Sequence, residues 1–302
     1  MQSNRFNLLL IIFLSMVLLF TIYTWMLKNI SEEIKNESTK SIHTSKKILI
    51  EELISLGIDK MRPLIFDIAR NETAMEAFNN NDTKMLKEKL MPTYIRLSTI
   101  GTTESIQLFD STNKLAFSAP NILDNRASVL VKKARIFKKI FASPFFDSEN
   151  KLALGIAFPL YEGNSFSGTV ILTKHFDYIL EHFNNHDNST STIISNDDYL
   201  NRNLPDIWKG FRMPDLYKDG HTVEKIGEKY FRIFAIPIFG SEDKVIAYIL
   251  NSKDFTKEYK KIQSKLDYFT MILLVSSVFI ISFIYLYALK YSKIIYKNKE
   301  KH

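Results

Sequence analysis

The sequence predicts an α+β protein in which two antiparallel-sheet modules stack on a long N-terminal helix, flanked by two transmembrane helices. Three observations predict this architecture. Uncharged apolar runs stand near both ends of the chain, at 6–27 and 269–289. A long helical pattern follows the first run. A hairpin pattern at Leu152 to Asp177 returns at Tyr230 to Asp254, each copy with an Ala-x-Pro step, a polar turn with Gly and a Val/Ile return strand.

The two apolar runs are predicted to cross a membrane. Each approaches or exceeds the ~20 residues that a helix needs to span a ~30 Å hydrocarbon core. The first could instead be a signal peptide, but its apolar part exceeds the usual ~7–15 residues, and Thr24 to Leu27 offers no small-residue cleavage site. We therefore expect an uncleaved anchor at 6–27.

The charges flanking the runs predict the orientation. The tail at 290–302 carries five lysines against one glutamate, which places it in the cytoplasm, where it can also contact anionic membrane lipid. Two spans then put residues 1–5 in the cytoplasm as well. The region between them is expected outside the inner membrane of a bacterium, on the periplasmic side. Cysteine is absent, so this region needs no disulfide.

Residues 28–70 are predicted to form a stalk helix, because apolar residues recur at helical spacing among Lys, Glu and Ser. Pro63 ends or kinks this helix. Its apolar face could pack on the chain's own domain or form the seam of a homodimer, and the pattern leaves both open.

Residues 71–186 form the predicted membrane-distal module. Capping residues at Asn71 to Asp82 interrupt two helical segments, and a strand–turn–strand pattern follows over Glu104 to Pro120. An amphipathic helix is expected over Arg126 to Phe141, before the first copy of the hairpin. Its expected inward residues are Val129, Ala134, Ile136, Phe137, Ile140 and Phe141.

Residues 187–254 form the predicted membrane-proximal module. A polar junction precedes a short strand, a short helix and a second antiparallel sheet that ends with the second copy of the hairpin. Residues 255–268 are predicted as a closing helix that leads into the second span.

This order of elements resembles the double Cache domain, the extracytoplasmic sensory module of bacterial chemoreceptors, histidine kinases and diguanylate cyclases. The residues that carry the resemblance are the first anchor, the long helix Lys28 to Met61, the hairpin FDSTNKLAFSAP, the two repeated hairpins and the closing helix. The resemblance implies two PAS-like modules and a small ligand bound in the distal one. It also implies transmission by small displacements of the helices that enter the membrane.

The sequence departs from the family in two places. The amino-acid-binding subfamily carries an Arg-x-Trp-Tyr cluster in the distal module, whereas the tryptophans here are Trp25 and Trp208, so recognition of amino acids is not predicted. A receptor would also continue into HAMP and output domains, but this chain stops thirteen residues after Leu289. We expect either a partner signalling protein or a truncated receptor.

No catalytic constellation or cofactor motif is predicted. His182 and His186 have the i, i+4 spacing of a zinc site, but they run into the polar segment NNHDNSTS, where solvated loop residues are expected. Asp197 and Asp198 have the turn context of capping residues. Gly-x-Ser-x-Gly, Walker and nucleic-acid-binding patterns are absent, so neither an enzyme nor a nucleic-acid partner is predicted.

A ligand pocket is predicted on the distal sheet, because such pockets are apolar with a few convergent polar groups. Its basic residues favour an anionic ligand such as a carboxylate, although the lysines could equally form a solvated helix face. The candidate ligand residues are Tyr94, Gln107, Phe117, Arg126, Lys133, Arg135, Phe145, Phe146 and Tyr161.

The function expected from these observations is ligand sensing without catalysis. A small molecule in the distal module would shift the stalk helix against the closing helix, and the signal would pass across the membrane in chemotaxis or two-component-type signalling. The alternative from another class is a structural or interaction subunit, or a Cache-fold remnant with a closed pocket.

Overall fold

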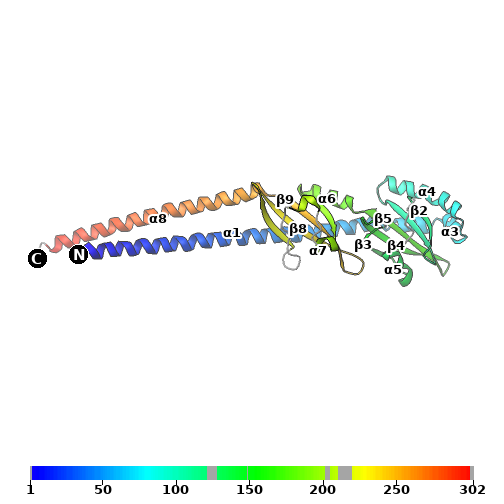
Figure 1. Cartoon of the computed structure of the whole chain (residues 1–302), viewed down its shortest axis with the longest axis horizontal. Coiled ribbons are helices and arrows are strands. Elements are labelled where there is room, and N and C mark those ends of the chain that lie inside the picture. Colours follow the sequence, from blue (N-terminus) through cyan, green and yellow to red (C-terminus); the bar gives the residue numbers. More distant parts are fainter. Residues whose placement is uncertain (1, 121–127, 148, 201–204, 210–219, 300–302) are drawn as a thin grey trace. The chain divides into compact units, whose positions relative to one another are not determined.

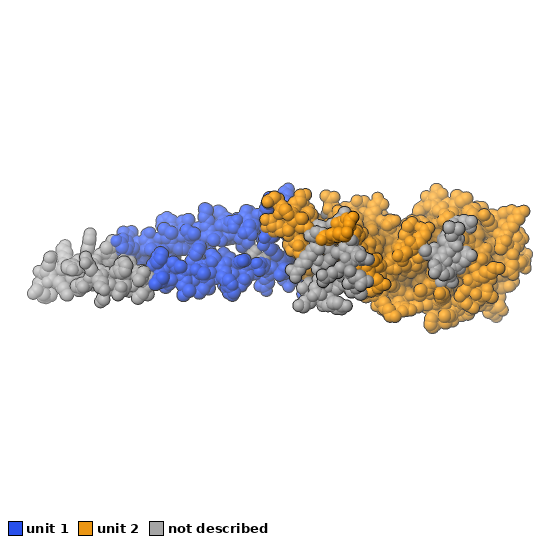
Figure 2. Space-filling view, in the orientation of Figure 1, with its two compact units in different colours: residues 1–40, 255–302 blue, residues 41–254 orange. Residues whose placement is uncertain are grey.

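The computed structural model describes residues 2–120, 128–147, 149–200, 205–209 and 220–299. The chain divides into two compact units. We call residues 1–40 and 255–302 the helical unit, and residues 41–254 the two-sheet unit (Figures 1 and 2). The combination of long helices with two antiparallel sheets confirms the predicted α+β class.

The structure contains the following elements. The helices are α1 (Gln2–Met61), α2 (Leu64–Ala69), α3 (Glu72–Asn79), α4 (Thr83–Thr99), α5 (Val129–Phe137), α6 (Asp177–Asp187), α7 (Asn196–Leu200), the 3-10 helix η1 (Asp206–Trp208) and α8 (Thr256–Lys299). The strands are β1 (Ser105–Asp110), β2 (Leu115–Ala119), β3 (Phe141–Phe146), β4 (Leu152–Glu162), β5 (Ser165–His175), β6 (Thr190–Ser195), β7 (His221–Ile226), β8 (Lys229–Phe239) and β9 (Val245–Asp254).

The helical unit consists of the first part of α1 together with α8. Both helices are long and apolar enough to cross a membrane, judged by length and composition. Their apolar side chains are exposed within the unit, and Phe283 is 73% exposed. A helix that crosses a membrane exposes its apolar side chains to lipid, so this exposure agrees with the two predicted spans.

The two-sheet unit holds two antiparallel sheets. Sheet A has the strand order β2-β1-β5-β4-β3, and sheet B has the order β6-β9-β8-β7. Neither sheet mixes parallel and antiparallel strands, so short turns join most neighbours, as the hairpin patterns predicted.

One apolar core joins α1 to one face of each sheet. Strand alternation puts Ile106 and Leu108 on the face of sheet A that packs on α2, α3 and α4, which we call the helix face. Phe234 of sheet B belongs to the same core, as do Ile50 and Met61 of α1. Each sheet has a second core on its other face, so both sheets are covered on both sides.

The repeated hairpins β4–β5 and β8–β9 share a backbone irregularity. The register shifts after Leu160 in the first hairpin and after Ile238 in the second. Pro159 and Pro237 stand next to these shifts, beyond the residues that pair with β3 and β7. A proline lacks the N–H that a ladder needs, and these positions beyond the pairing with β3 and β7 do not require one on that side.

The predicted inward face of α5 is largely wrong. Leu130, Val131 and Ala134 face sheet A, whereas Ile136 and Phe137 are 70% and 58% exposed. Of the other three residues predicted to face inward, two are exposed and one is half-buried. Val129 and Ile140 are exposed, and Phe141 is half-buried at the start of β3.

The geometry of α5 explains this error. Val129 and Ile136 are seven residues apart and share the outward side of the helix. The helix then stops after Phe137 because Lys138 is left-handed, with φ +52°. Ile140 therefore lies beyond the helix and does not share its buried face.

Gly168 allows the Phe78 ring of α3 to pack closely on β5, and replacing this glycine tests that packing. A Cβ there would overlap the carbonyl oxygen of Phe109 and lie 2.6 Å from the ring Cζ of Phe78. Gly168→Ala should therefore lower the free energy of unfolding of the full chain by about 1–3 kcal/mol, measured by urea unfolding. Ser167→Ala, one residue away, should change it by less than about 0.5 kcal/mol. Equal effects of the two substitutions would contradict the close packing at Gly168.

Candidate functional site

Polar side chains form a strip on the face of sheet A that α5 covers, which we call the α5 face. Alternation along β1 puts Gln107 and Phe109 on this face, and the register pairs them with Ile171 and Thr169 of β5. On β2, Ser118 stands opposite Gln107. The strip therefore crosses three neighbouring strands within an otherwise apolar face.

Thr169 carries the most informative polar group of this strip. The residue is 1% exposed, and its Oγ1 has no hydrogen-bond partner among the described residues. A buried hydroxyl without a partner costs about 1–3 kcal/mol. A ligand that supplied the missing hydrogen bond would recover this free energy.

The basic residues of α5 are only partly available to a ligand. The Lys133 amino group donates to the carbonyl of Ser241 at 2.9 Å and lies 3.6 Å from the Glu242 carboxylate, in the turn between β8 and β9. Lys244, and after it Lys133, hold the pKa of Glu242 below its usual value. Lys133 thus connects α5 to sheet B.

Four of the nine predicted ligand residues lie on the α5 face or on α5 itself. Gln107 and Phe145 lie on the α5 face, and Lys133 and Arg135 lie on α5 itself. Gly155 makes room for Phe145, because a Cβ at this glycine would lie 2.5 Å from the Phe145 ring. Gln107 on β1 and Phe145 on β3 are nevertheless separated in the sheet by β5 and β4.

The other predicted residues lie elsewhere. Tyr94 and Phe117 are in the core on the helix face, and Phe146 borders the same core. Tyr161 lies at the exposed end of β4, and Arg126 falls outside the described residues. Strand alternation separates Phe145 from Phe146, so these neighbours cannot serve one site.

Sequence reasoning missed Thr169 and Ser118. A signal for Thr169 was present, because Thr169, Ile171 and Thr173 alternate with the apolar Val170 and Leu172 along β5. That alternation could have assigned Thr169 to a face different from that of Val170. The alternation does not show that the Thr169 hydroxyl is buried without a described hydrogen-bond partner.

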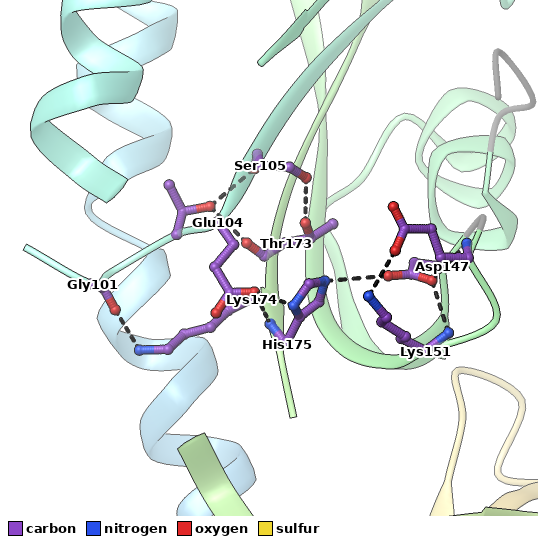
Figure 3. A network of polar contacts seen from close by, with 10 residues as sticks. Gly101, Glu104, Ser105, Asp147, Lys151, Thr173, Lys174 and His175 are labelled. Atoms are coloured by element: carbon purple, nitrogen blue, oxygen red, sulfur yellow. Dashed lines mark hydrogen bonds and ion pairs between the residues drawn. The ribbon is translucent and has the colours of Figure 1, made fainter. Parts of the chain in front are cut away.

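A second polar feature ties together three strand ends of sheet A (Figure 3). His175, at the end of β5, has Nδ1 2.7 Å from the Glu104 carboxylate and Nε2 3.4 Å from that of Asp147. Its backbone N–H also donates to Glu104 at 2.8 Å. Nearby, Lys174 donates to the carbonyl of Gly101. The network holds the ends of β1, β3 and β5 in register.

The histidine pair His182 and His186 lies within α6, so the loop expected at this position is wrong. The helix continues to Asp187 and ends at Asn188, which is left-handed at φ +53°. Both histidines are exposed. Within the described ranges, no three His, Asp or Glu side chains are grouped so that they could hold a metal ion.

Ser195, not the predicted Asp197 or Asp198, caps the first turn of α7. Ser195 precedes α7, and its Oγ accepts from the Asp198 backbone N–H at 3.0 Å, while its hydroxyl donates to the Asp198 carboxylate at 2.6 Å. The Ser195 hydroxyl thus satisfies one free N–H of the first turn and is itself held by the Asp198 side chain.

His43 places a titratable group of α1 against sheet B. Its ring is stacked on Phe234 at 6.0 Å, and its centroid is 5.7 Å from that of His221. Burial lowers the pKa of His43. The carbonyl of Ala235 opposes this shift, while His221 and Lys47 add to it.

Comparison by sequence finds no relatives, since no protein-family model and no curated protein matches the chain. Comparison by structure finds ligand-binding domains of bacterial chemoreceptors. That of Pseudomonas fluorescens CtaA with L-isoleucine has 14% identity and a TM-score of 0.47, and the match covers 76% of this chain and 98% of that one. Campylobacter jejuni Tlp3 with isoleucine has 12% identity and a TM-score of 0.45, with 76% and 96% covered. Pseudomonas aeruginosa PctC with GABA has 14% identity and a TM-score of 0.43, with 72% and 100% covered.

These structures belong to the class that the sequence resemblance named, the sensor domain of chemoreceptors. Their TM-scores are below 0.5 and their identities are low. The likeness therefore assigns no ligand and no site residue to this chain.

The lowered pKa of His43 predicts an acid-sensitive contact between α1 and sheet B. The unfolded chain, with a pKa of 6.5, binds the proton more readily than the folded chain, so the stability from neutral His43 is lost as the pH falls below 6.5. His43→Gln should flatten the fall in the thermal unfolding midpoint of the detergent-solubilised chain between about pH 7 and pH 5. His186→Gln, at an exposed position of α6, should leave the profile as it is. A His43→Gln profile parallel to that of the wild type would contradict the prediction.

Proposed function

We propose that the protein is a membrane-anchored extracytoplasmic sensor rather than an enzyme. It binds a small molecule on the α5 face of its first sheet module and passes a conformational signal across a bacterial inner membrane. Both termini lie in the cytoplasm, and the output belongs to a partner signalling protein in chemotaxis or two-component-type signalling.

The observation that carries this proposal is the continuity of α1. The helix runs unbroken from Gln2 to Met61 and contains the first candidate span. Its residues Ile50 and Met61 share one core with strands of both sheets. Any rearrangement of either sheet therefore acts on the same helix that enters the predicted membrane.

A second connection leads out of sheet B. Strand β9 ends at Asp254, and α8 begins at Thr256 with one residue between them. That residue, Phe255, is 2% exposed. A short, buried link transmits displacement of β9 to α8 without the slack of a long loop. Coupling energies of about 1–3 kcal/mol between two sites are sufficient for such a signal.

The ligand proposed for the α5 face is a small molecule that can carry an anionic group. The unpartnered hydroxyl of Thr169 and the side chain of Gln107 offer hydrogen bonds. The segment 126–141 contains six Lys or Arg residues and no Asp or Glu, which favours a carboxylate.

A structural or interaction subunit is the second candidate, and the outward side of α5 favours it. Ile136, Phe137 and Ile140 are exposed there, among Lys132, Lys138 and other basic residues. Apolar anchors with a basic rim are the composition of a protein contact surface. Failure of every ligand test below would leave this candidate in place.

Thr169→Val separates binding from stability. We expect it to raise the free energy of unfolding of the unliganded chain by about 1 kcal/mol, because it removes the unpartnered hydroxyl. The same change should weaken binding of the ligand about tenfold, because one hydrogen bond is lost. The measurements are thermal-shift screening of the full chain in detergent against carboxylates, amines and nucleobases, including L-isoleucine and γ-aminobutyrate, followed by calorimetric titration of each hit.

Thr190→Val provides the matched control, because Thr190 is exposed on β6, in sheet B. It should change neither stability nor affinity by a measurable amount. The absence of any stabilising compound would contradict the sensor proposal. A hit whose affinity is the same in Thr169→Val and wild type would contradict the assignment to the α5 face.

A further inference from the structure

A cavity of about 580 Å³ lies within the two-sheet unit, apart from the α5 face. It lies where the turn from β3 to β4 meets the segment that follows β6. Small-molecule sites typically measure ~300–1,000 Å³, so the volume suits a small organic compound. Both sheets contribute to its wall.

The sheet A side of the cavity is fixed by the network around His175 (Figure 3). One oxygen of Asp147 accepts from the backbone N–H groups of Glu149 and Lys151, each at 2.9 Å. The other oxygen faces His175, which Glu104 orients from the opposite ring nitrogen. This side of the cavity is therefore preorganised, with Lys151 at its rim.

The sheet B side is fixed by the Ser195–Asp198 pair at the start of α7. Ser195 and Asp198 hold each other by two hydrogen bonds, and both line the cavity. Apolar walls complete the site on both sides, formed by Phe146, Leu152 and Ile194. Leu152 and Ile194 are themselves buried.

The charges of the lining favour a cationic ligand. Its two lysines already face carboxylates that are not part of the lining. Lys151 lies 2.7 Å from Glu149, and Lys209 lies 2.6 Å from Asp206. The Asp177 carboxylate makes no hydrogen bond or close ion pair with any other described residue, and it shares the charge of Lys151 with Glu149 and Asp147. Around Lys151 the carboxylates therefore outnumber the ammonium group.

We propose that this cavity is a second ligand site, specific for a small organic ammonium compound. The ammonium group binds the carboxylates of Asp177 and Asp198, and the apolar part of the ligand packs on Phe146, Leu152 and Ile194. A charge-assisted hydrogen bond to a carboxylate is roughly twice as strong as a neutral one, which gives selectivity for the cation. A compound bound here contacts both sheets at once.

Three probes that share a phenylethyl group test the site: 2-phenylethylamine, 2-phenylethanol and 3-phenylpropanoate. They are titrated calorimetrically into the full chain in nanodiscs at neutral pH. The amine should bind more tightly than the alcohol and the acid. Asp177→Asn should weaken binding of the amine about tenfold or more, because a hydrogen bond to a charged group is lost.

Asp197→Asn is the matched control, since Asp197 is an exposed acid of α7 outside the lining. It should leave the affinity for the amine unchanged. No heat of binding with any probe would overturn the proposal, as would an amine affinity that Asp177→Asn does not reduce. Tighter binding of the acid, lost in Lys209→Met, would also overturn the ammonium assignment.

Thr169→Val distinguishes this proposal from that of the α5 face. It should leave binding of the amine unchanged, because Thr169 lies outside the lining. An amine site that persists while all α5-face ligands fail would support the second site and contradict the first. Loss of amine binding in Thr169→Val would place the amine on the α5 face and overturn the second site.

Discussion

The shared apolar core around α1 is the constraint on which the two-sheet unit depends. Ile50 and Met61 of α1 are buried with Leu154 of sheet A and Phe234 of sheet B in one continuous cluster. Burying one such side chain contributes roughly 1.5–3 kcal/mol, and moving either sheet along α1 would expose several of them. The sheets and the helix therefore respond together, and this common response is what makes a sensor role physically reasonable.

Polar side chains give two turns at opposite ends of sheet A different roles. The turns beginning at Asp110 and Asp147 have the same polar order, Asp-Ser-x-Asn-Lys, and in each the Asp accepts two backbone N–H groups while the Asn is left-handed. The side chain of Thr112 donates to the first Asp. The second Asp instead meets His175, which connects its turn to the rest of the sheet. Local sequence thus produces the same turn twice, and the tertiary neighbours decide its role.

Most of the fold could be predicted from the sequence, because local patterns carry it. The uncharged runs, the change from helical to strand period at Glu104 and the repeated Ala-x-Pro hairpin each depend on neighbouring residues alone. The candidate site was predictable only in part. Gln107 and Phe145 are on the α5 face but on separated strands, and Tyr94 and Phe117 are core residues of the opposite face. When a strand is covered on both sides, both of its faces are apolar. Hydrophobic periodicity alone therefore does not show which face contacts a ligand.

The sequence by itself determined the class of the fold, the two candidate spans and the duplicated hairpin. Only the tertiary structure decided that Ile136 and Phe137 face outward, that Lys133 is held by Glu242, and that the hydroxyl of Thr169 is buried without a described partner. The reason is physical. Hydrophobic period and capping act between residues a few positions apart, whereas burial, ion pairing and the satisfaction of a hydroxyl depend on segments that the fold brings together from distant parts of the chain.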